Sequence, residues 1–185
     1  MRELILGGAR SGKSRLAEKR AVVCEALGME VVYIATAEAW DPEMVERLTH
    51  HRNCRPAHWV TVEEPVKLAA TLQAQAAADR CLIVDCITLW LSALVFKGQA
   101  GAQMEAGQPI DCTLFEQERQ SLLDVLPGLS GEIILVSNEI GSGIVPENRL
   151  ARRFADEQGR FNQELAARCE RVTLSVAGIP VTLRG

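Results

Sequence analysis

The chain of 185 residues lacks the features that direct a protein to a membrane or to nucleic acid. No apolar run approaches the roughly 18 residues of a membrane span. The first residues run quickly into glycine and charge, unlike a signal peptide. Lysine and arginine form no block, and the formal net charge is −4. Because binding to a phosphate backbone needs clustered basic side chains, we exclude nucleic acid and membrane insertion and expect small substrates.

Cys-x-x-Cys pairs are also absent, although the chain contains six cysteines. Three of them lie in apolar runs, a pattern typical of reduced core thiols and not of a disulfide framework. We therefore expect a cytoplasmic protein. The cysteines are Cys24, Cys54, Cys81, Cys86, Cys112 and Cys169.

Short apolar runs alternate with longer amphipathic stretches along the chain. Strands are predicted at residues 3–6, 31–35, 59–61, 81–85, 132–137, 172–176 and 179–183, with 59–61 at an edge of the sheet. Helices are predicted at 14–27, 41–52, 64–78, 87–96, 111–126 and 149–169. This alternation predicts an α/β fold, with a doubly wound, mainly parallel sheet in a single domain of residues 1–185. Residues 98–109 show no period, and we expect an exposed excursion without an assigned role.

A glycine-rich motif follows the first predicted strand and opens the first helix. It matches G-x-x-x-x-G-K-[ST], the phosphate loop of P-loop nucleoside triphosphatase folds, here predicted to be RecA-like. Glycine accepts the unusual dihedrals that turn backbone amides toward phosphate, the lysine adds a positive charge and the serine hydroxyl is a ligand for Mg²⁺. The residues are Gly7, Gly8, Ala9, Arg10, Ser11, Gly12, Lys13 and Ser14.

Asp85 ends the apolar run Cys81 to Asp85 and supplies a candidate magnesium ligand. Carboxyl ends of parallel strands meet at one edge of the sheet, where ligands bind. An acidic residue there is expected to hold Mg²⁺ through water opposite the phosphate loop. Ser14 and Asp85 together therefore predict a nucleoside triphosphate site with magnesium.

The three histidines of the chain, His50, His51 and His58, lie within nine residues. They are open to three interpretations: ordinary polar residues, a zinc site that includes Cys54, or a nucleophile that forms a phosphoramidate. Zinc sites usually need a second ligand pair a dozen residues away, and none follows. Adjacent helical side chains point about 100° apart, so one histidine of the pair can face the phosphorus. His51 lies on the same stripe as Met44 and Leu48, which favours His51 over His50.

Several segments resemble the bifunctional adenosylcobinamide kinase/adenosylcobinamide-phosphate guanylyltransferase family of cobalamin biosynthesis. The similarity covers nearly the whole chain, and its most specific block runs from Val136 to Ala166. It is carried by "GGARSGKS", "YIATAE", "DPEMVERLTHHRNCRPAHW", "VDCITLWLS", "VSNEIGSGIVPENRLARRFADEQGRFNQELA" and "VAGIPVTL". The resemblance implies phosphorylation of adenosylcobinamide with ATP or GTP, followed by transfer of GMP from GTP through a histidine.

The resemblance also implies nucleotide contacts beyond the phosphate loop, at Thr36, Ala37, Glu38, Arg52, Asn53, Cys54, Arg55, Glu63 and Asp85. It implies a corrinoid substrate and a homotrimer, which would account for the apolar helix 87–96 and Trp90 as readily as a buried core helix would. Lys13 and His51 are the expected catalytic residues. Asn138 and Glu139 follow a predicted strand and are candidate corrinoid contacts. Two alternatives remain at this stage: a one-step small-molecule kinase with structural histidines, and a non-catalytic nucleotide-binding switch.

Overall fold

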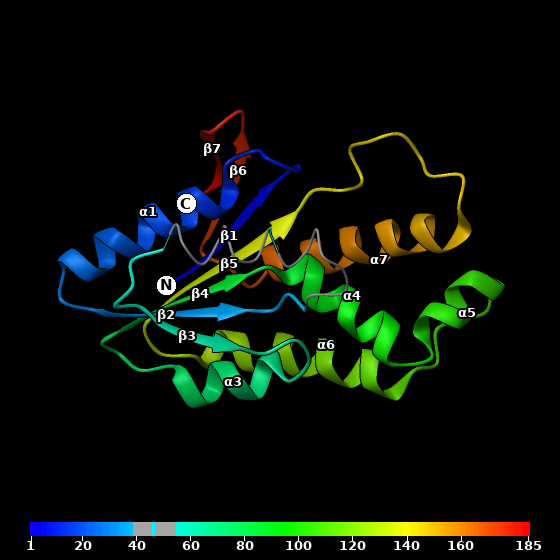
Figure 1. Cartoon of the computed structure of the whole chain (residues 1–185), viewed down its shortest axis with the longest axis horizontal. Coiled ribbons are helices and arrows are strands. Elements are labelled where there is room, and N and C mark those ends of the chain that lie inside the picture. Colours follow the sequence, from blue (N-terminus) through cyan, green and yellow to red (C-terminus); the bar gives the residue numbers. More distant parts are fainter. Residues whose placement is uncertain (39–45, 47–54) are drawn as a thin grey trace.

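The computed structural model describes residues 1–38, 46 and 55–185. Within them, one sheet of seven strands has the order β3-β2-β4-β5-β1-β6-β7 (Figure 1). All neighbouring strands pair in parallel except β7, which is antiparallel to β6. This arrangement confirms the predicted α/β fold with a mainly parallel sheet. The strands are β1 (Arg2–Gly7), β2 (Glu30–Ala35), β3 (Val60–Glu63), β4 (Arg80–Asp85), β5 (Glu132–Asn138), β6 (Arg171–Val176) and β7 (Ile179–Arg184).

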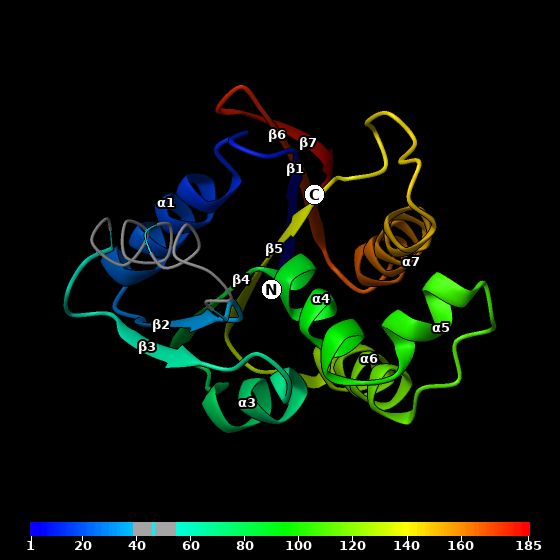
Figure 2. The same cartoon turned by 45° about the vertical axis from the view of Figure 1, so that its right-hand side comes forward.

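Helices cover both faces of the sheet, as Figure 2 shows. Successive strand residues point to opposite faces, so Ile5 of β1 packs with α1 while Leu4 and Leu6 pack with the helices of the other face. α1 lies on the first face, and α3, α4, α6 and α7 contribute to the core on the second. The helices are α1 (Lys13–Ala26), α3 (Leu68–Gln75), α4 (Ile87–Lys97), α5 (Ala100–Ala106), α6 (Thr113–Val125) and α7 (Arg149–Ala166), and the 3₁₀ turn η1 (Leu126–Gly128) follows α6.

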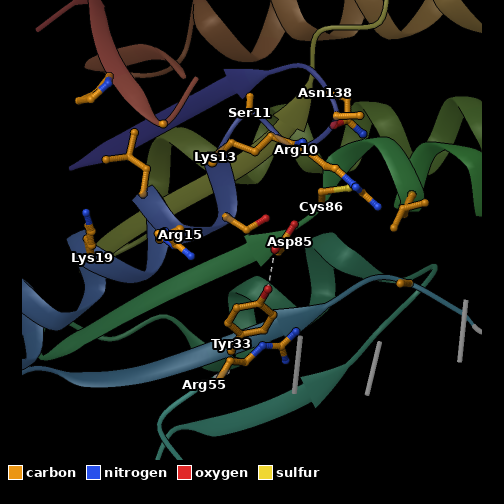
Figure 3. Close-up of a pocket in the computed structure, with 18 of the residues that line it drawn as sticks. Arg10, Ser11, Lys13, Arg15, Lys19, Tyr33, Arg55, Asp85, Cys86 and Asn138 are labelled. Atoms are coloured by element: carbon orange, nitrogen blue, oxygen red, sulfur yellow. Dashed lines mark hydrogen bonds between the residues drawn. The ribbon is translucent and has the colours of Figure 1, made fainter. Parts of the chain in front are cut away.

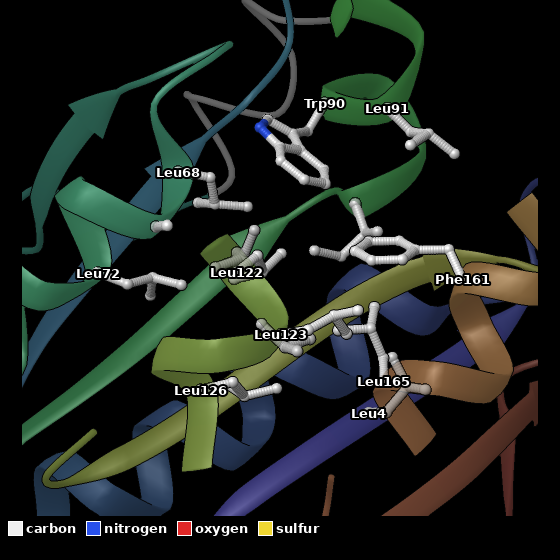
Figure 4. Close-up of a cluster of buried hydrophobic side chains, with 14 of the residues drawn as sticks. Leu4, Leu68, Leu72, Trp90, Leu91, Leu122, Leu123, Leu126, Phe161 and Leu165 are labelled. Carbon is white, nitrogen blue, oxygen red and sulfur yellow. The ribbon is translucent and has the colours of Figure 1, made fainter. Parts of the chain in front are cut away.

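The larger core cluster surrounds α4 and explains why this helix is so apolar (Figure 4). Trp90 is fully buried, its ring centroid lies 5.7 Å from that of Phe161, and its Nε1 donates to the Val66 carbonyl at 2.8 Å. Burying one side chain of this size stabilises the fold by about 1.5–3 kcal/mol. The apolar run of α4 is therefore accounted for by the core of this chain, without an interface between copies.

The prediction of an exposed excursion at residues 98–109 was wrong for its first part, although residues 105–109 are exposed. Residues 98–109 contain α5, in which Ala100 and Met104 are fully buried against the larger core cluster. A helix of seven residues is too short for its period to stand out in the sequence.

The helix predicted at 64–78 is also shorter, at Leu68–Gln75. Glu64 Oε1 accepts the amides of Val66 and Lys67 at 2.8 Å and 2.7 Å, which closes a turn before the helix begins. After the helix, Ala76 is already extended.

Three further predictions, on the helix at 41–52, on membrane spans and on the cysteines, can be compared with the described residues only. The helix predicted at 41–52 lies outside the described residues except for Glu46. Across the described part of the chain, no helix is both long enough and apolar enough to cross a membrane. Each described cysteine is a free thiol, and four are buried: Cys81, Cys86, Cys112 and Cys169.

Candidate active site

The phosphate loop joins β1 to α1 in a shape that depends on its glycines. A Cβ atom on Gly7 would lie 2.3 Å from Ser11 Oγ and 2.7 Å from the Ser175 carbonyl oxygen, so glycine is required. Gly12 precedes the helix at φ 92°, in the left-handed region that glycine accepts. Lys13 Nζ donates to the Gly8 carbonyl at 3.1 Å, which keeps the ammonium over the loop. The loop thus presents positive charge and the N-terminus of α1 to an anion.

Asp85 lies across from the loop, at the carboxyl end of β4 (Figure 3). Its Oδ2 accepts a hydrogen bond of 2.6 Å from the hydroxyl of Tyr33 on β2. Burial raises the pKa of Tyr33 well above its ordinary value, and the Asp85 charge raises it further. Tyr33 therefore remains a protonated donor that fixes one oxygen of Asp85.

A second carboxylate, Glu18, is close enough to Asp85 for their charges to interact. Glu18 lies one turn after Ser14 on α1. Burial raises the pKa of Glu18, and repulsion by Asp85 adds to the shift. Glu18 does not line the cleft, so Asp85 is the carboxylate placed to meet a divalent cation near Ser14.

Arg55 adds a cation with spare hydrogen-bonding capacity. Its guanidinium carbon lies 3.5 Å from the centroid of the Tyr33 ring, in a cation–π contact. Its Nε and one terminal nitrogen are buried and have no hydrogen-bond partner among the described residues. Buried donors of this kind normally have a partner, and a planar guanidinium binds phosphate well. Arg55 is thus suited to an anionic ligand.

These groups line one cleft of about 940 Å³. It runs over the phosphate loop, the ends of β2, β4 and β5, and the turn between β6 and β7. Asp85 is the one acidic residue among the described residues that line it, against five basic ones. The basic residues are Arg10, Lys13, Arg15, Lys19 and Arg55. The electrostatics of the cleft therefore favour a polyanion.

Comparisons with known proteins agree with this chemistry. A family model described as "Cobinamide kinase / cobinamide phosphate guanyltransferase" matches residues 3–183. The chain belongs to this family. It is 53% identical to the bifunctional adenosylcobalamin biosynthesis protein CobP of Pseudomonas aeruginosa, with 100% of this chain and 98% of the relative covered. It is 41% identical to CobU of Salmonella typhimurium and 40% identical to CobU of Escherichia coli, both named as bifunctional adenosylcobalamin biosynthesis proteins, with 98% of each chain covered.

The structure brings most of the described site residues of this family member together. Those that line the cleft are Ala9, Arg10, Ser11, Gly12, Lys13, Ser14, Ala37, Arg55 and Asp85. Gly7 and Gly8 begin the same loop. His51, Arg52, Asn53 and Cys54 lie outside the described residues.

Three expected nucleotide contacts lie away from the cleft lining. Thr36 is fully buried, and its Oγ1 donates to the Cys86 carbonyl at 2.7 Å, so it fastens β2 to the end of β4. Glu38 pairs with Lys97 of α4 at 2.8 Å. Glu63 ends the edge strand β3, where it pairs with Ala35 of β2. Any effect of Thr36 on the cleft is therefore indirect: its hydrogen bond holds the ends of β2 and β4 together, and these ends carry residues that line the cleft.

The one described histidine is far from the phosphate loop. His58 Nε2 lies 2.5 Å from Oε1 of Glu25, near the end of α1 opposite the loop. At 1.5 Å per residue, α1 separates Glu25 from Lys13 by about 18 Å. In the described part of the chain, no three His, Cys, Asp or Glu side chains form a metal-binding group. His50, His51 and Cys54, the other members of the proposed zinc set, lie outside that part.

Several lining residues were not expected from the sequence. Tyr33, the only tyrosine of the chain, lies two residues before the end of β2 and points toward Asp85 (Figure 3). Arg15 and Lys19 are four residues apart on the helix that the phosphate loop opens, a spacing that places them on one face. That spacing could have identified them. The remaining unexpected lining residues are Leu16, Ala35, Cys86, Leu89, Ala177, Gly178 and Pro180.

Asn138, a candidate corrinoid contact, lines the cleft and rests on a buried polar network. Its amide donates to Thr88 Oγ1 at 2.8 Å, and its carbonyl accepts from Asn162 Nδ2 at 3.1 Å. Asn162 Oδ1 in turn accepts from Ser137 Oγ at 2.7 Å and from Gln158 Nε2 at 3.0 Å. The network therefore fixes the end of β5 relative to α4 and α7. The other candidate, Glu139, donates its amide to the Gly7 carbonyl at 3.0 Å, outside the cleft lining.

Proposed function

We propose that this protein phosphorylates adenosylcobinamide with ATP or GTP and then transfers GMP from GTP to the product, giving adenosylcobinamide-GDP. One domain of residues 1–185 carries both activities, in the cytoplasm. The observation that carries the proposal is the cleft over the phosphate loop, which Lys13, Asp85 and Arg55 line together, with two Arg55 nitrogens that have no partner among the described residues. Membership of the family supports the choice of substrates.

In the kinase step, the γ-phosphoryl group moves to the aminopropanol hydroxyl of adenosylcobinamide, and ADP or GDP leaves. Such transfers depend on positioning and on neutralising charge. Lys13 and the amides of the loop bind the β- and γ-phosphates. Arg55, stacked on Tyr33, is placed to neutralise charge on the opposite side of the cleft.

The donor set fits Mg²⁺. The Ser14 hydroxyl and the Oδ1 atom of Asp85 are hard oxygen ligands of two residues that line one cleft, and magnesium prefers such ligands with retained water. Tyr33 holds the other Asp85 oxygen, which fixes the carboxylate in place. Ser14 and Asp85 would hold the ion, which neutralises phosphate charge when it is bound.

In the transferase step, a neutral histidine attacks the α-phosphorus of GTP, a P–N bond forms and pyrophosphate leaves. The phosphate of adenosylcobinamide phosphate then displaces the histidine and forms the new diphosphate bond. The nucleophile belongs to the pair His50 and His51, and the position of His51 on the stripe of Met44 and Leu48 favours it. His58 is paired with Glu25 and has a structural role.

Labelled GTP separates this function from its alternatives. The protein is incubated with GTP labelled at the α-phosphorus, and we expect label on the protein that acid releases and base does not. Lys13→Ala is the control and is expected to lose both activities, because the ammonium serves every polyphosphate at the loop. Kinase turnover without an adduct would indicate a one-step kinase, and binding without any turnover of cobinamide would indicate a nucleotide switch.

The two histidine variants then identify the nucleophile. His51→Ala is expected to abolish the adduct and the transferase step while ATP-dependent phosphorylation stays measurable, because that step moves phosphate directly to the alcohol. His50→Ala is expected to weaken guanylylation without removing it. The reverse result would assign His50, and an adduct that survives in both variants would refute the covalent assignment to this pair.

We also propose that the protein assembles as a homotrimer. Ile179, Val181 and Leu183 point to one side of β7 and are 65%, 45% and 57% exposed. An exposed apolar stripe on a sheet edge is the kind of surface that oligomers cover.

A further inference from the structure

The loop between β5 and α7, residues 139–148, presents two aliphatic side chains to solvent. Ile144 is 97% exposed, more than any other large apolar side chain among the described residues, and Val145 next to it is 72% exposed. Neither belongs to a core cluster. Exposed apolar groups that adjoin one another are typical of a surface that binds another molecule. The loop is therefore a candidate binding surface.

Hydrogen bonds hold the loop at both ends. Where it begins, the Glu139 amide donates to the carbonyl of Gly7, the first residue of the phosphate loop, at 3.0 Å. Where it ends, Arg152 Nη1 donates to the Pro146 carbonyl at 2.8 Å, and the Asn148 side chain caps α7. The position of the loop beside the phosphate loop is thus set by the fold.

The loop leaves the sheet at the mouth of the cleft. In the sheet, β5 lies between β4, which carries Asp85, and β1, which leads into the phosphate loop. Asn138, the last residue of β5, lines the cleft, whereas residues 139–148 do not. Figure 1 shows the loop, coloured yellow, extending from the end of β5 beyond the sheet before it returns to α7. A ligand that emerges from the cleft past Asn138 therefore meets this loop.

The acceptor substrate of the proposed reaction is too large for the cleft alone. Pockets of about 300–1,000 Å³ bury one drug-sized ligand, and the cleft of about 940 Å³ must also hold the nucleotide. The corrin ring of adenosylcobinamide must therefore remain outside, while the aminopropanol arm brings its hydroxyl to the γ-phosphorus. The γ-phosphate belongs near Ser14 and Asp85, the candidate ligands of a cation that bridges the β- and γ-phosphates. The arm accordingly enters on the Asp85 side, past Asn138.

The surface of the loop suits the rim of a corrin ring, which carries methyl groups and uncharged carboxamide chains. Ile144 and Val145 supply aliphatic contacts, and the exposed peptide units of residues 141–143 can hydrogen-bond carboxamides. A Cβ atom on Gly143 would meet nothing closer than 3.9 Å, so the backbone there is open to a ligand. We propose that residues 141–145, and Ile144 above all, form the binding surface for the corrin ring; this rests on the function proposed above.

This surface is separate from the one proposed for assembly. Ile179, Val181 and Leu183 lie on the edge strand β7, and β1 and β6 separate that strand from β5. The proposed assembly therefore does not use the loop between β5 and α7.

Equilibrium dialysis of adenosylcobinamide, followed by the visible absorbance of the corrin, tests the surface. The protein is saturated with a non-hydrolysable ATP analogue, so that binding is measured without turnover. Ile144→Ser is expected to weaken adenosylcobinamide about tenfold, from the loss of a side chain that the ring covers, and to leave the affinity for the ATP analogue unchanged. Leu27→Ser is the matched control, since Leu27 is 79% exposed at the far end of α1, and is expected to change neither affinity.

Kinase assays separate this contact from a role in the chemical step. Ile144→Ser is expected to raise KM for adenosylcobinamide by the same factor, with kcat and KM for ATP unchanged, because the ring is bound equally in the ground state and the transition state. A fall in kcat with constant KM for adenosylcobinamide would overturn the proposal.

Three further results would contradict the surface. Unchanged binding of adenosylcobinamide in both Ile144→Ser and Val145→Ser would show that the ring lies elsewhere. Equal weakening of the ATP analogue would show that the loop only shapes the phosphate loop, and a changed sedimenting mass would place the pair in an interface between copies. Wild-type protein that binds adenosylcobinamide without phosphorylating it would overturn the proposed function and leave the surface standing, whereas a wild-type protein that does not bind it would overturn both.

Hydrogen–deuterium exchange of the wild-type protein tests the same contact without a substitution. Adenosylcobinamide, added to the protein saturated with the ATP analogue, is expected to slow exchange at the amides of residues 141–145 and to leave residues 179–183 of β7 unchanged. Exchange at residues 141–145 that is equally fast with and without the corrinoid would overturn the proposal.

Discussion

Arg55 has two buried nitrogens without a hydrogen-bond partner in the described part of the chain, so we expect nucleotide binding to depend on it. Its guanidinium stacks on Tyr33, and two of its nitrogens have no partner within the described residues. Arg55→Lys keeps the charge but loses the planar stacked fork. We expect KM for the nucleotide to rise about tenfold or more, since a hydrogen bond to a charged group contributes about 1.5–3 kcal/mol. Steady-state kinase assays measure this, and Arg160→Lys on the exposed face of α7 is the control.

If Arg55→Lys left KM unchanged, the free donors of Arg55 would not contact the nucleotide. A fall in kcat with constant KM would instead place its contact in the transition state alone.

The pair His58 and Glu25 predicts a dependence of stability on pH. The hydrogen bond from His58 lowers the pKa of Glu25 below its ordinary value of 4.5. A carboxyl group whose pKa is lower in the folded state contributes stability above its unfolded pKa and loses it as pH falls through the folded value. His58→Ala is therefore expected to melt at a lower temperature than wild type above pH 4.5, with a difference that shrinks at lower pH.

Thermal unfolding across that pH range, followed by fluorescence of the buried Trp59, measures the effect. Glu25→Gln is expected to show a similar loss, and the double variant should lose little more than either single one. A difference between His58→Ala and wild type that stays constant across the range would contradict the assignment.

At the scale of single residues, the sequence was informative where chemistry follows a motif. The phosphate loop and Asp85 are recognisable because glycine, lysine and a strand-end carboxylate occur at set positions. The sequence did not show that Thr36 is a core residue and not a cleft residue. Neighbouring residues at the end of β2 face the cleft and the core in turn, so a shift of one position along the chain changes the assignment. Tyr33 was missed because it lies within an apolar run and reads as core, where it is indeed buried.

At the scale of elements, the network behind Asn138 joins β5, α4 and α7 through buried polar groups. Asn162→Leu keeps a similar volume but removes three hydrogen bonds, and unsatisfied groups of this kind cost about 1–3 kcal/mol. We expect a lower unfolding free energy in urea and a lower kcat, because Asn138 loses its support beside the loop. Gln163→Ala, on the exposed face of the same helix, is the control.

Rescue separates the two roles of the network. If kcat of Asn162→Leu stayed at the wild-type value while stability fell, the network would only hold α7 to the sheet. Asn162→Asp retains an acceptor for Ser137 and is expected to recover part of the activity.

Strands and helices could be predicted where their hydrophobic pattern extended over enough residues to be recognised. The strands of continuous Val, Ile and Leu were predicted to within a residue or two, because burial on both faces leaves no other composition. α5 was missed since two of its seven residues are glycine or glutamine and its burial comes from packing against distant α7, which no local pattern records. The order of the strands in the sheet was likewise beyond the local sequence.

At the scale of the whole molecule, the apolar stripe of β7 predicts the assembly. Sedimentation equilibrium is expected to give three times the chain mass of 20.2 kDa. Val181→Arg places a charge in the middle of the stripe and is expected to shift the protein toward the mass of one chain, because an unpaired charge in an interface is costly. A wild-type protein that sediments as a single chain would rule out the trimer.

The position of β1 between β5 and β6 bears on how the protein is made. β1 precedes every other described strand in the chain, yet its neighbours in the sheet are residues 132–138 and 171–176. At about 5–20 residues per second, Ser175 is added about 8–34 s after Gly7. The phosphate loop has no flanking strand until β5 has been made, and it lacks the hydrogen bonds of Ser175 and Gly178 to the Ser11 carbonyl for the whole interval. The growing chain therefore lacks the fully supported phosphate loop until β6 and the turn after it have been made.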